Sequence, residues 1–257
     1  KDKGSLYIGK PISWKIAVKN HAGFPANSVT LITERIISLK CFAAMEPSNS
    51  DGNRSSYGNN RWLWSNIRRW LTSQAGAGAW YAAPHGQEAP PHTSNVWSNY
   101  NEYEAEAGFL AGFSANFIAA LLTTNRTVGK AQADGGGTET CTDKIFFATS
   151  TEVGLSGDVV AGSNLALFTD DNSRKAKPTA ECVSKSEYQT SSCNVNDPWY
   201  WWLADAYASP SCYVRHVYSS GAMHWNSAYY GSRGVRPLCN LKSEILVSDS
   251  PDSDGAY

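Results

Sequence analysis

Short runs of β-branched and aromatic residues predict strands separated by polar, glycine-containing loops. Residues 13–19 (SWKIAVK) and 28–42 (SVTLITERIISLKCF) lie on either side of the sequence NHAGFPAN, so we expect a strand, a loop and a longer strand. Residues 142–149 (TDKIFFAT) predict a buried strand. Three more strands are expected at residues 200–203, 213–218 and 234–241, with Ser219, Ser220 and Gly221 as the turn after the second. Pro237 favours an edge or bulge position for the last strand, because proline cannot donate a ladder hydrogen bond.

Helical spacing of apolar residues occurs only in short segments. Ser65 precedes the sequence NIRRWL as a helix cap, and Ser114 takes the same place before residues 115–123. Other short helical segments are expected at residues 103–111, 164–168 and 179–186, with one turn beginning at Ser150. Three segments without periodicity are expected to be loops, namely residues 73–98, 132–139 and 174–178.

These elements predict one α+β domain over residues 1–248, in which short helices pack on small antiparallel sheets. The chain begins with Lys1 rather than Met, and residues 249–257 are polar and acidic. We therefore expect a piece of a longer protein, with residues 249–257 as the start of a linker to a further C-terminal region. The longest apolar stretch, residues 108–122, is short and interrupted, so we expect no membrane insertion.

Charge and cysteine usage narrow the function classes. The chain has 22 basic and 23 acidic residues, a net charge of −1 and no Lys/Arg-rich block, so a nucleic-acid binder is disfavoured. The six cysteines form no C-x-x-C pair, which argues against zinc-ribbon and thioredoxin-like sites. We expect buried thiols, with a Cys182–Cys193 bridge as the alternative in an oxidising environment.

Few residues suggest a metal or a cofactor. His85 and His92 lie in the long loop with Glu88 between them, but exposed loop histidines are usually solvated. Gly135, Gly136 and Gly137 lack the lysine of a phosphate loop and predict a flexible turn. The oxygen-rich stretches 46–60 and 170–172 are compatible with a structural calcium ion, although neither has EF-hand spacing. We therefore expect no cofactor, with structural calcium as the alternative.

Aromatic residues are concentrated near the C-terminus. The 32 residues from Trp199 to Tyr230 include 10 of the 31 aromatic residues in the chain, interleaved with serine and asparagine. An antibody paratope has this composition, in which tyrosine and tryptophan supply contact area and serine and asparagine supply adaptable hydrogen bonds. The alternative is a tyrosine-rich, half-buried sheet, which accounts well for the continuous run Trp199–Trp202. The lack of strict alternation in the rest of the segment favours a binding surface.

Five motifs in a fixed order resemble a bacterial and phage domain family of uncharacterised function. They are SNIRRWL, TDKIFFATSTEV, KPTAECVS, WYWWL and GVRPLCNL, and the resemblance covers residues 10–248. The closing motif is similar to the last strand of the formylglycine-generating-enzyme type of C-type lectin fold. The same fold carries the variable proteins of diversity-generating retroelements. The resemblance therefore implies a C-type lectin-like fold.

In those variable proteins, template adenines are randomised, so that asparagine codons become Tyr, His, Ser, Asp and similar residues. Residues 204–232 resemble such a variable segment, with Val214, Val217 and the turn residues 219–221 as fixed scaffold. The resemblance implies these variable, ligand-binding positions: Asp205, Tyr207, Pro210, Cys212, Tyr213, His216, Tyr218, His224, Trp225, Asn226, Tyr229, Tyr230 and Ser232. Two departures are Ala204-Asp205-Ala206, where the family has Arg-[Ser/Thr]-Pro, and Trp225, which an AAY codon cannot produce.

The resemblance implies a receptor-binding display domain on a phage virion or a bacterial surface. Its partner would be a surface protein or glycan of a bacterial host cell, and no catalytic residue is expected. One alternative is a structural domain of a virion protein or adhesin. The other is an oxidase like the formylglycine-generating enzymes, for which Cys212 and Cys239 are the candidate thiols.

Overall fold

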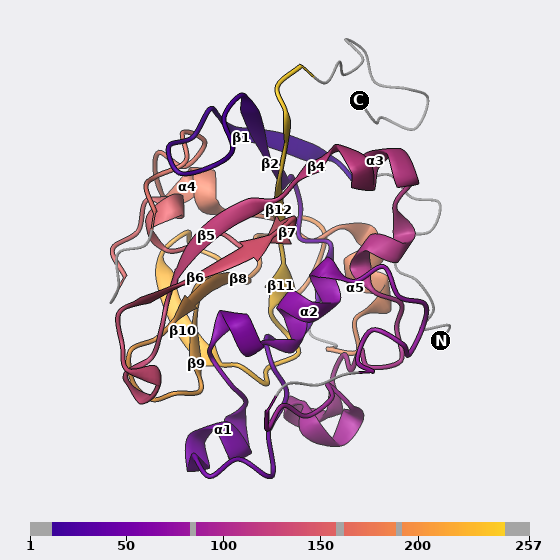
Figure 1. The fold of residues 1–257 in the computed structure, drawn as a ribbon. Coiled ribbons are helices and arrows are strands. Elements are labelled where there is room, and N and C mark those ends of the chain that lie inside the picture. Colours follow the sequence, from indigo (N-terminus) through magenta and orange to yellow (C-terminus); the bar gives the residue numbers. More distant parts are fainter. Residues whose placement is uncertain (1–11, 83–85, 158–161, 189–191, 245–257) are drawn as a thin grey trace.

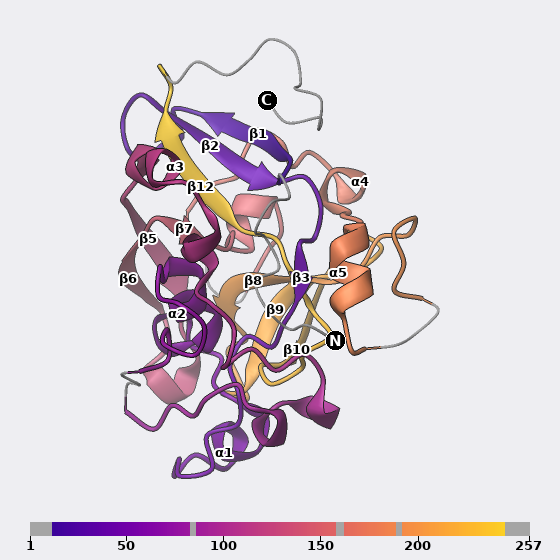
Figure 2. The same cartoon turned by 90° about the vertical axis from the view of Figure 1, so that its right-hand side faces the viewer.

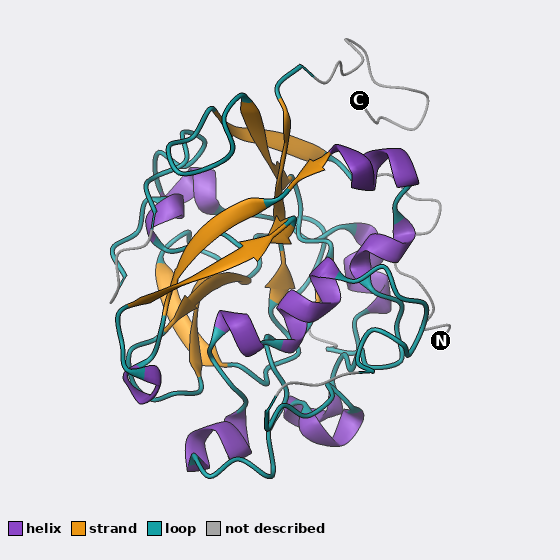
Figure 3. Ribbon diagram, in the orientation of Figure 1, coloured by secondary structure: helices purple, strands orange, loops and turns teal. Residues whose placement is uncertain are grey.

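The protein is described here by a computed structural model that covers residues 12–82, 86–157, 162–188 and 192–244. Short helices and several sheets are joined by long loops, which confirms the expected α+β class (Figure 3). The α-helices are α1 Gly52–Tyr57, α2 Asn66–Thr72, α3 Ala115–Ala120, α4 Asp171–Arg174 and α5 Ala180–Lys185. Single 3-10 turns lie at Trp62–Trp64, Thr93–Asn95, Trp97–Asn99, Phe109–Gly112, Gln132–Asp134 and Thr151–Val153. The linker expected at residues 249–257 lies outside the described residues.

The first sheet pairs strands from both ends of the chain. Its order is β1-β2-β12-β4, and β7 also pairs with β12 (Figure 1). The strands are β1 Trp14–Lys19, β2 Ser28–Thr33, β4 Leu121–Leu122, β7 Ile145–Phe146 and β12 Leu238–Lys242. The strand expected over residues 28–42 ends at Thr33, because the chain leaves this sheet there and joins the second sheet as β3 Ser38–Leu39.

The second sheet has the order β10-β9-β8-β11-β3. Its other strands are β8 Trp201–Ala206, β9 Tyr213–Val217, β10 Met223–Ser227 and β11 Gly234–Val235. Strands β8 and β11 run parallel, whereas β8, β9 and β10 are successive antiparallel neighbours. Residues 219–221 connect β9 to β10 as expected, and Gly221 has a φ of 93°. A β-carbon at Gly221 would lie 1.9 Å from the carbonyl oxygen of Asp171, so only glycine fits.

Pro237 lies between β11 and β12, where the chain crosses from the second sheet to the first. Both strands have neighbours on both sides, so the expected edge position is wrong. Proline is tolerated here because the ladder is interrupted, and its carbonyl oxygen accepts a hydrogen bond from the Thr33 N–H at 3.1 Å. Strands β1 and β2 of the first sheet lie near one end of the molecule and helix α1 lies at the other, with β8, β9 and β10 of the second sheet between them (Figure 2).

The helix caps expected from the sequence are present. Ser65 and Ser114 each accept a hydrogen bond from a backbone N–H in the first turn of α2 and α3. The helix expected over residues 179–186 is α5, and the Thr179 side chain caps it in the same way. Two other segments differ from expectation, since residues 103–111 contain only a 3-10 turn and residues 164–168 contain no helix. Residues 124–143 form a hairpin of β5 Thr124–Gly129 and β6 Thr138–Asp143, with the glycine run in its connection.

Most of the tryptophan content serves the core. Six of the ten tryptophans are buried, and each of their indole N–H groups donates a hydrogen bond. The acceptors are the Asp143 carboxylate for Trp62 and backbone carbonyls for Trp70, Trp80, Trp199, Trp201 and Trp202. A buried indole needs such a partner, and these bonds fix ring orientations. The structural interpretation of the run Trp199–Trp202 therefore holds for its three tryptophans.

The sequence motifs contact one another inside the fold. Arg68 of the SNIRRWL motif forms an ion pair with Asp143 of the TDKIF motif at 2.8 Å. Arg236 of the GVRP motif donates to the Thr33 carbonyl at 3.0 Å and lies 4.9 Å from the Trp201 ring. These residues hold the sheets and α2 together, so the motifs mark the scaffold of the domain.

All six cysteines are buried free thiols, as expected, and the alternative Cys182–Cys193 bridge is not formed. In the described ranges, no helix combines the length and apolar character that crossing a bilayer requires.

Candidate functional site

Four of the thirteen expected binding positions are buried. Asp205, Cys212, His216 and Ser232 present almost no surface to solvent. The Asp205 carboxylate accepts hydrogen bonds from the backbone N–H groups of Gly129 (2.9 Å) and Ser150 (2.6 Å), so it joins β8 to two neighbouring segments. A partner in solution cannot reach these four side chains, so they belong to the scaffold and not to a binding surface.

The two thiols proposed for oxidase chemistry are in apolar surroundings. Burial raises the pKa of the Cys212 thiol to about 11 and raises that of Cys239 further. Such surroundings disfavour the thiolate, which is the reactive form of cysteine.

The nine other expected positions are half-buried or exposed, and they are Tyr207, Pro210, Tyr213, Tyr218, His224, Trp225, Asn226, Tyr229 and Tyr230. They lie on β9, on β10 and in the loops next to these strands. The structure therefore brings them together at the free edge of the second sheet, where β10 is the outermost strand (Figure 1).

One group of rings gathers on one face of the β9–β10 hairpin. The rings of Tyr213 and Trp225 are stacked with centroids 4.4 Å apart, and Tyr207 lies 5.7 Å from Trp225. The guanidinium of Arg215 lies 4.3 Å from the centre of the Tyr207 ring. Because Arg215 is directly opposite Trp225 in the register, both side chains leave the sheet on the same face. We call Tyr207, Tyr213, Arg215 and Trp225 the first ring cluster.

A second ring cluster, Tyr200, His216, Tyr218 and His224, lies on the opposite face. His224 pairs with His216 in the register, and this pair is one residue along the strands from the Trp225–Arg215 pair. Because successive side chains of a strand point to opposite faces, the two pairs lie on opposite faces of the sheet. Tyr200 and Tyr218 have centroids 4.7 Å apart, and Tyr218 and His224 are 5.6 Å apart. His224 is also 5.6 Å from Trp225, so the two clusters meet at the edge strand.

Residues from distant segments extend this surface. Tyr57 at the end of α1 contacts Tyr229 with centroids 5.7 Å apart, and Trp97 stacks on Tyr230 at 4.6 Å. The sequence carries no local signal for either contact, because both depend on how remote loops fold back onto residues 229–230. We define the aromatic surface as Tyr57, Trp97, Tyr200, Tyr207, Tyr213, Tyr218, His224, Trp225, Asn226, Tyr229 and Tyr230.

Arg233 adds a positive charge to the aromatic surface. Its guanidinium lies 4.7 Å from the Tyr200 ring and 5.5 Å from the Tyr230 ring. Burial lowers the pKa of Arg233, and no carboxylate of the described residues lies within ion-pair distance of it. The surface therefore combines tyrosine, tryptophan and arginine, the residues that dominate binding energy at protein interfaces.

Asn60 fixes the loop that carries Tyr207 and Tyr213. Its buried amide nitrogen donates to the carbonyl oxygens of Tyr207 (3.1 Å), Pro210 (3.4 Å) and Tyr213 (2.9 Å). Sequence reasoning placed Asn60 only within a calcium-compatible stretch. Its role depends on a contact across about 150 residues of sequence, which no local pattern indicates.

The oxygen-rich stretches use their oxygens internally. The amide oxygens of Asn49 and Asn59 accept hydrogen bonds from backbone N–H groups, so their nitrogens face Glu46. Asp170 caps α4 through its own side chain. Among the described residues, no group of three or more His, Cys, Asp or Glu side chains is arranged to hold a metal ion. The histidine pair of the long loop, which was expected to be solvated, falls partly outside this range, since His85 is not described.

The other members of that loop have protein partners. Glu88 forms an ion pair with Arg69 at 3.0 Å, and the His92 ring accepts a hydrogen bond from the Ser94 backbone N–H.

Comparison with known proteins identifies the family of the chain. A family model described as a domain of unknown function, DUF6273, matches residues 27–243. No curated protein and no solved structure matches the chain. The match spans both sheets from β2 to β12, and with them the whole aromatic surface. The chain therefore belongs to the DUF6273 family.

Proposed function

We propose that this domain is a ligand-binding module that presents its aromatic surface to a partner. In this proposal it has a C-type lectin-like fold and is the diversified target protein of a retroelement, displayed on a phage virion or a bacterial surface. The partner is a surface protein or glycan of a bacterial cell. The pairing of β2 with β12, which brings both ends of the chain into one sheet, is compatible with such a fold.

One observation carries the proposal. Rings on β9, β10, the residues next to β8, the end of α1 and Trp97 form a connected series around the edge of the second sheet, in which Arg233 links Tyr230 to Tyr200 and Trp225 is 37% exposed. Monomeric proteins rarely leave a contiguous aromatic surface open without a binding role. The burial of Cys212 and Cys239 favours binding over oxidase chemistry, since an oxidase needs accessible thiols.

The mechanism of recognition would be non-covalent. Stacked rings such as Tyr213 and Trp225 are already oriented in the free protein, so little side-chain entropy is lost when a partner binds. Tyrosine hydroxyls and the Asn226 amide would supply directional hydrogen bonds at the rim. Diversification would act on the solvent-facing positions, whereas Asp205, Cys212, His216 and Ser232 would stay constant because the core depends on them.

The test is the binding of the fluorescently labelled domain to intact bacterial cells and to purified cell-surface glycans, measured by flow cytometry and glycan array. Replacing Tyr213 and Trp225 together with serine removes the stacked pair, and we expect binding to fall at least about tenfold. The matched control is Ile16→Ser on β1, which removes a 53% exposed apolar side chain at the other end of the molecule. Unchanged binding by the double variant would contradict the proposal.

A further inference from the structure

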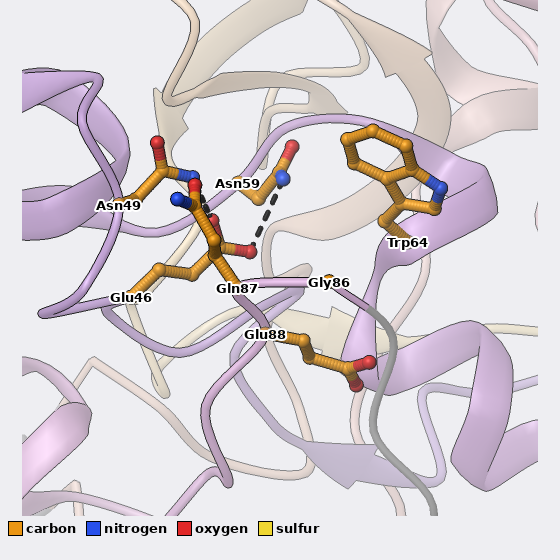
Figure 4. Close-up of a pocket in the computed structure, with 7 residues that line it drawn as sticks. All are labelled: Glu46, Asn49, Asn59, Trp64, Gly86, Gln87 and Glu88. Carbon is orange, nitrogen blue, oxygen red and sulfur yellow. Dashed lines mark hydrogen bonds between the residues drawn. The ribbon is translucent and has the colours of Figure 1, made fainter.

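A cavity outside the aromatic surface combines an exposed indole with buried carboxylates. It has a volume of about 250 Å³ and lies between the α1 region and residues 86–88. Its lining residues are Glu46, Asn49, Asn59, Trp64, Gly86, Gln87 and Glu88 (Figure 4). This volume is below the roughly 300–1,000 Å³ of pockets for drug-sized ligands, so the occupant is a small molecule or one end of a larger one.

Glu46 places a buried carboxyl group in the wall of the cavity. The residue is 2% exposed, yet no cation of the described residues lies within ion-pair distance of its carboxylate. Its oxygens accept from the amides of Asn49 (2.5 Å) and Asn59 (3.1 Å), and the nearby Arg54 is bonded to Asp134 instead. Burial raises the pKa of the Glu46 carboxyl, whereas the amides of Asn49 and Asn59 and the charge of Arg54 lower it.

The second carboxylate of the lining, Glu88, is paired with an arginine. Glu88 is bonded to Asn66 at 2.8 Å and to Arg69 at 3.0 Å, and burial raises its pKa to about 7 in spite of the arginine. With Arg69 paired to Glu88, Glu46 is the carboxyl group without an ion pair among the described lining residues. The cavity therefore repels anions and favours a cation.

Trp64 is held as a rigid wall of the cavity. It is 40% exposed, and the other end of its 3-10 turn is anchored by the buried Trp62, whose indole donates to Asp143. The Arg61 guanidinium lies 4.0 Å from the Trp64 ring and is itself fixed by a bidentate ion pair with Glu139. An indole face beside carboxylates is suited to a cation with apolar groups, because the ring quadrupole attracts positive charge.

The hydrogen bonds in the wall argue against a sugar. The amides of Asn49 and Asn59 donate to Glu46 and accept from backbone N–H groups, so their geometry is already committed to the protein. A monosaccharide needs several free donors and acceptors for its hydroxyl groups. The lining therefore leaves a ligand the negative potential, the indole face and the exposed side chain of Gln87.

We propose that this cavity binds a small organic ammonium ion, with Glu46 as its countercharge and the Trp64 indole as the surface on which its alkyl groups pack. An organic cation is favoured over a metal ion because the lining combines an indole face with carboxylates, whereas among the described residues no group of three or more His, Cys, Asp or Glu side chains is arranged to hold a metal ion. This site is separate from the aromatic surface and does not rest on the proposed function.

The test is calorimetric titration of the whole domain with tetramethylammonium chloride, against sodium chloride at equal ionic strength. We expect tetramethylammonium to bind saturably with a dissociation constant below about 10 mM, and sodium chloride to show no saturable binding. Glu46→Gln keeps the shape of the side chain but removes the charge, and should weaken binding at least about tenfold. Trp64→Ala should weaken it several-fold through loss of the indole face.

The matched control is Trp225→Ala, which removes a tryptophan of similar exposure from the aromatic surface. It should leave ammonium binding unchanged while reducing binding to cells, so failure of one proposal is distinguishable from failure of the other. Circular dichroism verifies that each variant is folded. The inference is overturned by equal affinity in Glu46→Gln, by absence of saturable heat, or by binding of methyl glucosides instead of the ammonium ion.

Discussion

His216 is the buried member of the second ring cluster, and neither of its ring nitrogens is hydrogen-bonded to a described residue. Tyr200, Trp202 and His224 surround the ring with centroids 5.7–5.9 Å away. Burial lowers the pKa of His216 well below its ordinary value, and Arg233, His224 and Arg215 act in the same direction. The imidazole is therefore neutral in the folded protein near neutral pH.

This burial predicts a loss of stability in acid. Below pH 6.5, the usual histidine pKa, the unfolded chain takes up a proton that folded His216 does not, so the free energy of unfolding falls as pH falls. Replacing His216 with phenylalanine should remove the contribution of this imidazole to the change of unfolding free energy with pH, which is at most about 1.4 kcal/mol per pH unit. Urea denaturation of both proteins between about pH 5 and 7 measures it.

His224→Phe is the control for this prediction, because His224 is exposed on the neighbouring strand. It should leave the pH slope close to that of the unmodified domain. Parallel pH profiles for His216→Phe and the unmodified domain would show that the buried imidazole is protonated in the folded state.

At the scale of elements, the connection between β8 and β9 carries Tyr207 and Tyr213 and is held by one side chain. Asn60 donates to three carbonyl oxygens in residues 207–213. Asn60→Ala leaves those carbonyls without this donor, and we expect a loss of about 1–3 kcal/mol of stability. Hydrogen exchange in peptides covering 207–213 should become faster, and binding through the aromatic surface should weaken.

Asn59→Ala is the matched control, since Asn59 is the neighbouring buried asparagine but donates to Glu46 in the cavity. It should not change exchange in residues 207–213. The same protection of this segment in both variants would contradict a positioning role for Asn60.

Local sequence signals predicted the elements that depend on local physics. The caps at Ser65 and Ser114 could be predicted because the accepting side-chain oxygen and the donating backbone N–H lie three residues apart. The hairpin β5–β6 and the edge strand β10 were missed because their stability comes from neighbours in space. Pro237 was misplaced for the same reason, since the crossing between two sheets is a property of the whole fold.

On the scale of the whole molecule, the aromatic surface is assembled from four separate parts of the chain. Residues 57, 97, 200 and 207–230 are far apart in sequence, and the fold brings their rings together. The continuous run Trp199–Trp202 pointed to a structural role, which the burial of its three tryptophans confirms, whereas composition alone could not rank the exposure of the other rings in the segment. Burial also excludes four of the expected binding positions, Asp205, Cys212, His216 and Ser232. Composition could not identify them, because it carries no information on which side chains of a segment point into the core.

The central claim is that the solvent-facing positions at the edge of the second sheet are diversified for recognition. Deep sequencing of the encoding gene across natural populations, with a search for a near-identical template repeat, tests it most directly. The account predicts substitutions at Tyr207, Pro210, Tyr213, Tyr218, His224, Asn226, Tyr229 and Tyr230 that trace to template adenines, with the four buried positions constant. Substitutions that fall equally on buried and exposed positions, or a segment as invariant as the rest of the chain, would contradict it.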